Sequence, residues 1–226
     1  MNLKTFWGRF LIFIVFPLLT SCFQIVEEIN LHNDGTGNVR LTINLSQSKT
    51  KVQSVMLLDS INGYAVPSKQ KIQQELAEAV AYLKKSPGIS DVKSTSDFTN
   101  YIATISFAFK DVSNINNITK NILNQHKIKA SNTSSYSYDK AGRIFSRQYK
   151  ALPDAKNAYN KLKNQDKAIF NNATYTSIYR FDVAITNAAN PMSNVSKSRT
   201  AVMLKSNVMD LINGKVNVSN QIQLSK

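Results

Sequence analysis

Cysteine, histidine, glycine and proline are all scarce in this sequence of 226 residues, which contains 1 Cys, 2 His, 7 Gly and 5 Pro. A single cysteine cannot form an internal disulfide. A structural zinc site needs about four histidine or cysteine ligands, and a catalytic one needs about three protein ligands. Few glycines and prolines also leave little room for long flexible linkers. The sequence therefore excludes a disulfide framework and a zinc domain, and it favours a continuous fold.

Signatures of catalysis are missing as well. His32 lies beside a predicted hairpin turn and His126 at a predicted helix end, where a surface or dipole-satisfying role is typical. There is no G-x-S-x-G elbow and no glycine-rich phosphate loop, and the 14 acidic residues are scattered. We therefore expect no metal, no cofactor and no enzymatic activity. A hydrolase with an unrecognised Ser-His-Asp site stays as an alternative, because serine and aspartate are plentiful.

The sequence has one long apolar run, residues 10–19, and it follows two basic residues, Lys4 and Arg9. The run is too short to cross a bilayer as a helix, which needs about 20 apolar residues. A cationic start, an apolar stretch of about 7–15 residues and a small-residue cleavage site define a secretory signal. We predict that residues 1–21 are a signal peptide and that residues 22–226 form the exported protein.

The signal ends with Leu19, Thr20, Ser21 and Cys22. These residues resemble the lipobox of bacterial lipoproteins, in which a Leu stands three places before the Cys with small residues between them. The resemblance implies that the Cys22 thiol receives a diacylglyceryl group, that a type II signal peptidase cuts before it, and that the new amine is acylated, for example with palmitate. The alternatives are a chance cysteine behind an ordinary signal and an uncleaved N-terminal helix. An unpaired exported thiol argues against the first.

The resemblance places the protein in the cell envelope, attached to a membrane through its N-terminal lipid. Phe23 follows the cysteine, and no acidic residue stands next to it. In the enterobacterial pattern an Asp there retains a lipoprotein at the inner membrane, so its absence implies the outer membrane, facing the periplasm. Other bacteria use other rules, and Glu27 and Glu28 weakly resemble acidic surface-export signals.

Hydrophobic periodicity predicts the fold of the exported part. Two period-two runs around Asp34-Gly35 predict a β-hairpin directly after the cysteine. Strands are predicted at 25–31, 39–45, 89–98, 101–109, 134–138, 143–149, 175–185, 198–208 and 215–224. Helices are predicted at 48–61, from Ser68 to Pro87-Gly88, after Asp111 or Ser113, and from Pro153.

Strands that are adjacent in sequence and joined by short turns pair in antiparallel fashion. We therefore predict an α+β fold, with helices packed on one face of an antiparallel sheet and recurring strand-strand-helix units. Residues 22–226 would form a single domain, and a sub-boundary would fall near 130–150. The hairpin after Cys22 and the strand pair at 88–109 resemble LppM-like envelope lipoproteins. That resemblance covers the first half of the chain and brings no catalytic residues with it.

Positive charge is in excess, at +14 for the whole chain. Residues 120–167 contain eleven basic and three acidic residues. A basic surface beside a membrane attracts anionic head groups, so anionic lipid or an acidic envelope partner is expected. The alternative is a compositional bias toward Lys, Asn and Ile. Nucleic acid is not expected, because no helix-turn-helix or zinc-finger pattern is present.

The predicted hairpin within this segment interleaves aromatic rings with basic residues, and it is our candidate binding surface. It comprises Tyr136, Tyr138, Lys140, Arg143, Phe145, Arg147 and Tyr149. A solvated, twisted hairpin is the alternative interpretation.

Other aromatic residues alternate along predicted strands, namely Phe107, Phe109, Tyr175, Tyr179 and Phe181. Such a stripe is typical of a packed core, and the alternative is a pocket for a lipid or other apolar ligand. We conclude that the chain is a non-catalytic binding or assembly component of the envelope. A carrier or chaperone for an apolar ligand and an unrecognised hydrolase are the alternative functions.

Overall fold

The computed structural model describes residues 23–226 except 62, 117, 119, 120, 123–131, 152, 168 and 169. The predicted signal peptide, the predicted lipobox with Cys22, and His126 therefore lie outside the described residues. No helix in the described part is long and apolar enough to cross a membrane.

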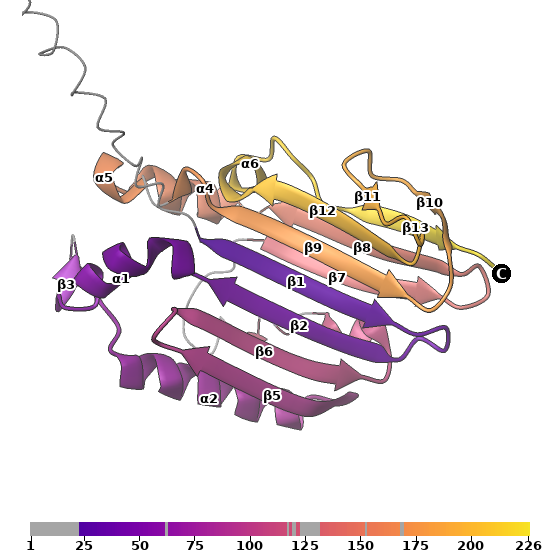
Figure 1. Ribbon diagram of the computed structural model, residues 1–226, viewed down its shortest axis with the longest axis horizontal. Coiled ribbons are helices and arrows are strands. Elements are labelled where there is room, and N and C mark those ends of the chain that lie inside the picture. Colours follow the sequence, from indigo (N-terminus) through magenta and orange to yellow (C-terminus); the bar gives the residue numbers. More distant parts are fainter. Residues whose placement is uncertain are drawn as a thin grey trace, which may run out of the picture.

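The described elements are mostly strands (Figure 1). The strands are β1 (Gln24–Leu31), β2 (Gly37–Asn44), β3 (Ser60–Ile61), β4 (Tyr64–Ala65), β5 (Ile89–Asp97), β6 (Ile102–Phe109), β7 (Asn132–Asp139), β8 (Ile144–Ala151), β9 (Thr174–Phe181), β10 (Ile185–Ala188), β11 (Asn194–Val195), β12 (Ala201–Asn207) and β13 (Asn220–Leu224). The α-helices are α1 (Lys49–Val55), α2 (Lys69–Lys85), α4 (Pro153–Asn160), α5 (Asn164–Lys167) and α6 (Val208–Ile212). Two 3-10 helices, η1 (Ser46–Ser48) and η2 (Val112–Ile115), complete the set.

The larger sheet has the strand order β11-β12-β9-β1-β2-β6-β5. Its hairpins β1–β2 and β5–β6 follow the predicted turns, and the two strands of each hairpin pair in antiparallel fashion. β1 and β9 are parallel, with Gln24 opposite Thr174 and Leu31 opposite Phe181. Sequence periodicity does not reveal this pairing, because the two strands are far apart in the chain.

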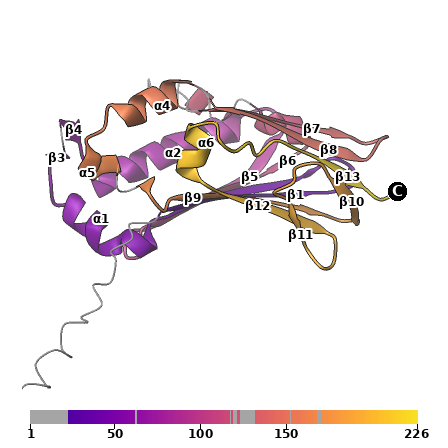
Figure 2. The same cartoon turned by 90° about the horizontal axis from the view of Figure 1, so that it is seen from above.

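The smaller sheet has the order β10-β13-β8-β7 and is antiparallel. Figure 2 shows that it lies on the same side of the larger sheet as α2 and α4. α2 packs beside β5 at this face. The Ser68 hydroxyl caps α2 by accepting a hydrogen bond from the Lys71 amide at 3.1 Å, as predicted for an N-cap. The α+β class and the antiparallel sheets are confirmed.

The core fills the space between the two sheets. Inward side chains of the larger sheet, including Ile29 and Tyr179, meet Phe145 and Ile222 of the smaller one. The ring centroids of Phe145 and Tyr179 are 5.0 Å apart, a favourable distance for aromatic pairs. The predicted aromatic stripe belongs to this core: Phe107, Phe109, Tyr179 and Phe181 are all buried in it. A packed core, not a lipid pocket, is therefore the role of these four rings.

Three predicted strands differ from the structure, because the chain changes sheets. The predicted strand 175–185 is broken: β9 ends at Phe181, and β10 begins at Ile185 in the smaller sheet. The predicted final strands do not pair with each other, since β12 lies in the larger sheet and β13 in the smaller. α6 occupies part of the connection between them, with the Asn207 side chain as its cap. The first helix is also shorter than predicted and ends at Val55.

Candidate functional site on the smaller sheet

β8 gives the smaller sheet its two faces. Successive side chains of a strand point to opposite faces. Phe145, Arg147 and Tyr149 point toward the larger sheet, whereas Ser146 and Gln148 point away from it. The strand pairing agrees with this division, because buried Arg147 lies opposite buried Asn220 and Tyr136. The predicted binding hairpin therefore has an inner and an outer layer.

The inner layer is centred on Arg147, whose side chain is only 2% exposed. Its Nη1 donates a hydrogen bond to the Tyr179 hydroxyl at 2.8 Å, and its Nη2 lies 3.7 Å from Oε2 of Glu27. The guanidinium also lies 5.3–5.7 Å from the ring centroids of three tyrosines, which is cation-π geometry. These tyrosines are Tyr136, Tyr149 and Tyr175.

Glu27 is the counter-charge, and it comes from the inward face of β1. The Tyr136 hydroxyl donates to Glu27 Oε1 at 2.9 Å, and the Tyr175 hydroxyl donates to Oε2 at 2.9 Å. One carboxylate on the larger sheet thus binds a tyrosine and an arginine from the smaller sheet. We call Glu27, Tyr136, Arg147, Tyr175 and Tyr179 the inter-sheet cluster.

Burial determines the protonation states in the inter-sheet cluster. It raises the pKa of Tyr136, Tyr175 and Tyr179 above the ordinary tyrosine value, and the nearby Arg147 only partly offsets this. Burial alone would lower the pKa of Arg147, but the Glu27 carboxylate and the surrounding tyrosines raise it. The tyrosines therefore stay neutral while the arginine stays charged.

The seven residues predicted as one exposed binding surface do not form one. Tyr136, Phe145 and Arg147 are buried between the sheets, because they fall on the inward positions of β7 and β8. Tyr149 is half-buried and lies against Arg147. Tyr138, Lys140 and Arg143 lie at or beside the β7–β8 turn, near the β1–β2 turn, where Arg143 donates to the Asn33 side chain at 3.4 Å.

The basic segment 120–167 is likewise not a single patch in the described part of the chain. Lys140 and Arg143 are at the β7–β8 turn, whereas Lys156 and Lys167 belong to α4 and α5 at the other end of the molecule (Figure 1). Arg147, which also belongs to this segment, is buried between the sheets. Net charge over the segment therefore overstates the positive potential of any one surface.

His32 meets a carboxylate, but not in a hydrolase arrangement. Its Nδ1 lies 3.1 Å from Oδ1 of Asp182, and both side chains are about half exposed. Asp182 also accepts a hydrogen bond from the Asn33 amide at 3.2 Å. No serine takes part in these contacts among the described residues. The pair joins the β1–β2 turn to the end of β9, which is a structural role.

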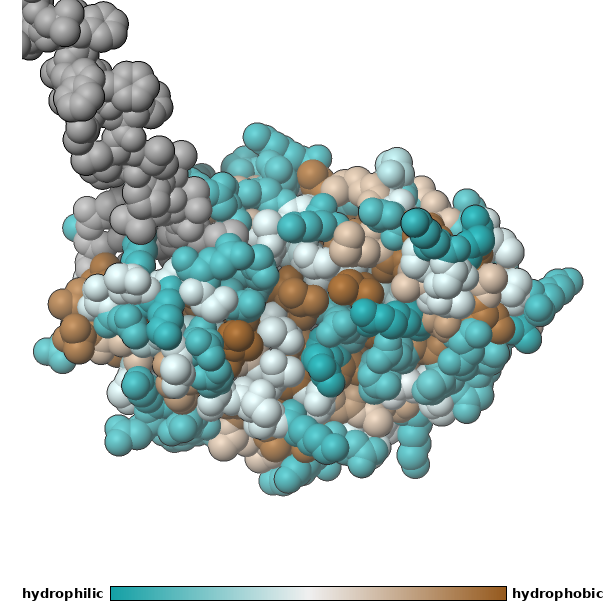
Figure 3. Space-filling model, viewed as in Figure 1, coloured by the Kyte–Doolittle hydropathy of each residue, from teal (hydrophilic) through white to brown (hydrophobic). Residues whose placement is uncertain are grey.

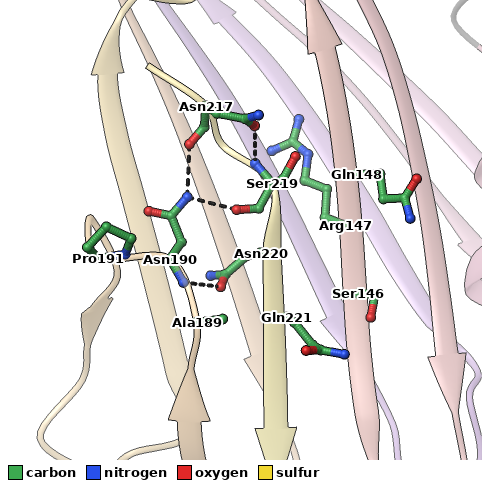
Figure 4. Close-up of a pocket in the computed structure, with 10 residues that line it drawn as sticks. All are labelled: Ser146, Arg147, Gln148, Ala189, Asn190, Pro191, Asn217, Ser219, Asn220 and Gln221. Atoms are coloured by element: carbon green, nitrogen blue, oxygen red, sulfur yellow. Dashed lines mark hydrogen bonds between the residues drawn. The ribbon is translucent and has the colours of Figure 1, made fainter. Parts of the chain in front are cut away.

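The outer layer contains a shallow hollow of about 500 Å³ where β13 begins (Figure 4). Ladder pairing between β8 and β13 ends at Arg147 and Asn220. Beyond that point the Ser219 hydroxyl, and not the β13 backbone, bonds to the backbone of β8. It accepts a hydrogen bond from the Tyr149 amide at 2.8 Å and donates one to the Tyr149 carbonyl at 3.3 Å. The strands separate here, and the hollow forms at the separation.

Asparagines fix one wall of the hollow. The Asn190 side-chain amide donates to the carbonyls of Asn217 and Ser219 at 2.8 and 2.7 Å. Its backbone amide donates to Asn220 Oδ1 at 2.9 Å, and Asn220 in turn donates to Ser193. These amides are occupied by internal bonds, so they shape the wall and are not free to bind.

The opposite wall carries free polar groups. Ser146 and Gln221 are direct partners on β8 and β13, and Gln148 lies two residues along β8. Their side chains form no hydrogen bond with the described residues, and both glutamines are exposed. A second hollow of about 480 Å³ shares Gln148 and Ser219 with the first. Two neighbouring strands thus present amide and hydroxyl groups in an open setting, with Arg147 at the edge of the first hollow and Lys150 at the second.

Sequence reasoning did not single out this wall. Alternation along the predicted strand 143–149 did place Ser146 and Gln148 on one face. Their neutral side chains, however, resemble those of any solvated strand, and Gln221 comes from a strand whose true partner was not predicted.

Comparisons with known proteins give matches among solved structures only. No protein family matches the chain, and no curated protein sequence does. Among solved structures, the folded domain of LppM from Mycobacterium tuberculosis is similar in fold, with a TM-score of 0.45 and 12% sequence identity. The match covers 89% of this chain and 88% of that one.

The raised pKa values predict the response to alkali. A tyrosine whose pKa is higher in the folded than in the unfolded state stabilises the fold below about pH 10, the ordinary tyrosine value, and loses that contribution as pH rises through the folded-state pKa. We expect stability to fall above about pH 10. When native protein is titrated with base, tyrosinate absorbance should appear at a higher pH than it does for the same chain in urea. It should then rise as the protein unfolds. Superimposable titration curves of native and urea-unfolded protein would contradict the burial of these tyrosines.

Proposed function

We propose that this protein is a lipid-anchored lipoprotein of the bacterial envelope whose domain binds a neutral, hydroxyl-rich ligand, such as an envelope glycan, without catalysing a reaction. The anchor rests on the match of Leu19, Thr20, Ser21 and Cys22 to the lipobox. In addition, the fold begins at once: β1 starts at Gln24, so the domain follows the lipidated residue without a stalk.

The observation that supports ligand binding is the free polar wall formed by Ser146, Gln148 and Gln221. Primary amides and hydroxyls both donate and accept hydrogen bonds, as sugar hydroxyls do. No carboxylate or histidine lines the described hollow, so it offers hydrogen bonding and not proton transfer. Its open shape fits a chain-like ligand that rests on a sheet better than a small molecule that must be enclosed.

The two alternative functions have less support. Four of the five aromatic residues that would line an apolar pocket are part of the packed core. His32 has an acidic partner but no nearby nucleophile among its contacts in the described chain. For the location within the envelope, we retain the outer membrane facing the periplasm, on the absence of an acidic residue after Cys22.

The anchor is tested by replacing Cys22 with alanine. We expect the wild-type protein to yield an N-terminal peptide that begins at Cys22 and carries the mass of the acyl chains. A palmitate analogue fed to the cells should label it. Cys22→Ala should abolish both signals because the thiol that receives the diacylglyceryl group is gone. An unmodified Cys22 in the wild-type protein, or cleavage elsewhere, would disprove the lipoprotein assignment.

The binding wall is tested by removing its amides. Gln148→Ala combined with Gln221→Ala should weaken co-sedimentation with purified cell-wall glycan by about tenfold or more, since each lost hydrogen bond is worth about 1 kcal/mol. Gln73→Ala, an exposed glutamine on α2, is the matched control and should bind as wild type does. Equal sedimentation of all three proteins would rule out this wall as the glycan site.

A further inference from the structure

Several elements meet at the end of the domain where β1 begins. We call it the anchor end, and define it by Phe23, the start of β9 at Thr174, the end of β2 at Asn44, and α1 with the turn that follows it. Gln24, Asn44 and Thr174 are neighbours in the larger sheet, because β1 pairs with both β2 and β9. η1 and α1 continue directly from the end of β2. Figures 1 and 2 both show α1 at this end of the molecule.

Phe23 is held firmly onto the domain. Its carbonyl accepts a hydrogen bond from the Thr174 amide at 3.0 Å. Its ring lies edge-on to Phe170, with centroids 5.7 Å apart, and Phe170 is in turn edge-on to Tyr159 at 5.6 Å. The preceding residue is Cys22, whose Cα is about 3.8 Å further along the chain. A lipid on Cys22 therefore leaves the domain at this end, with no slack to hold the domain away from the bilayer.

The most exposed apolar side chains of the described residues are at the same end. Leu57 is 86% exposed and Leu58 51% exposed, and they follow α1 in the turn before β3. Exposing two adjacent leucines to water is unfavourable, and burying them in an apolar environment would be favourable. Figure 3 shows apolar residues at the surface at this end of the molecule.

The charges on α1 suit a membrane surface, and the acidic neighbour of Lys49 is Asp97 at the end of β5. Lys49 and Lys51 are on α1, just before the leucines, and residues 45–58 include no acidic residue. Asp59 closes the segment. A short helix with lysines, followed by leucines that project beyond it, is typical of an element that sits at the head-group boundary. Each lysine near an anionic surface strengthens binding by roughly fivefold.

We propose that the turn after α1 inserts Leu57 and Leu58 into the bilayer that holds the Cys22 lipid. This contact rests on the proposed lipid anchor. It adds a second point of attachment to the one at Cys22. Together the two points restrict how the domain can tilt relative to the bilayer. The β7–β8 turn of the smaller sheet, at the opposite end of the molecule, then points away from the membrane surface (Figure 1).

The test uses the full, natively lipidated chain in vesicles of phosphatidylethanolamine and phosphatidylglycerol. Leu57→Cys carries a polarity-sensitive fluorophore, and lipids with a quencher at the upper part of the acyl chain report depth. The matched control is Met192→Cys, since Met192 is also apolar and exposed but lies between β10 and β11, away from the anchor end (Figure 1). Unsubstituted protein, whose single cysteine carries the lipid, is the labelling blank.

We expect the fluorophore at position 57 to shift to the blue on vesicle binding and to lose most of its emission to the quencher, while position 192 does neither. Leu58→Ser together with Lys49→Glu and Lys51→Glu should reduce the quenching at position 57 severalfold without releasing the chain. If the chain floats with vesicles but position 57 is as hydrated as position 192, the insertion is wrong and the anchor stands. If the unsubstituted chain does not float at all, the anchor and this inference both fail.

Discussion

The buried contact between Arg147 and Glu27 is the ion pair around which the two sheets of this domain pack. The arginine comes from the centre of the smaller sheet, and the glutamate comes from the centre of the larger one. A charge removed from water is tolerated only when an opposite charge and hydrogen bonds surround it. The three tyrosine hydroxyls and the aromatic faces provide that setting. The sheets can therefore pack in only the register that brings this arginine to this glutamate.

The surfaces of the molecule follow from that register. Side chains alternate along β8. A register that places Arg147 on the inner face therefore places Ser146 and Gln148 on the outer face. The hollow opens where Ser219 replaces the backbone partner of Tyr149, one residue beyond the buried Arg147–Asn220 pair. Residues that hold the sheets together and residues of the proposed binding wall thus alternate along the same strand. The parallel pairing of β1 with β9 has a similar effect at the other end, because it brings Phe23 against Phe170 and fixes where a lipid on Cys22 leaves the fold.

Local features of the sequence predicted most of the elements. Asp34-Gly35 marks the first hairpin, Ser68 caps α2, and Pro153 begins α4, each for a reason that involves only neighbouring residues. Contacts between distant segments were not predicted. The β1–β9 pairing, the passage from β9 to β10 between sheets, and the separation of β12 from β13 all depend on such contacts.

At the candidate site, too, local sequence patterns were informative, whereas contacts between distant segments were not predicted. Arg147 and its aromatic neighbours were predicted to form an exposed binding surface, whereas Arg147 is buried between the sheets in contact with tyrosine rings. Period-two alternation does not say which face of a strand is buried when both faces carry polar or aromatic residues. Tyr136, Phe145 and Arg147 were therefore assigned to the surface, and the neutral wall formed by Ser146, Gln148 and Gln221 passed unnoticed. Burial of an arginine is decided by its counter-charge, and Glu27 lies more than a hundred residues earlier in the chain.

A double-mutant cycle between Arg147 and Glu27 tests the central claim most directly. The proteins are wild type, Arg147→Met, Glu27→Gln and the double variant, and the free energy of unfolding is measured by urea titration. Removing one partner of a buried ion pair costs about 3–5 kcal/mol, whereas removing both leaves no charge unpaired. We predict that the double variant is more stable than the sum of the single losses implies, by about 1–3 kcal/mol. Additive losses, within about 0.5 kcal/mol, would show that the contact does not hold the sheets together.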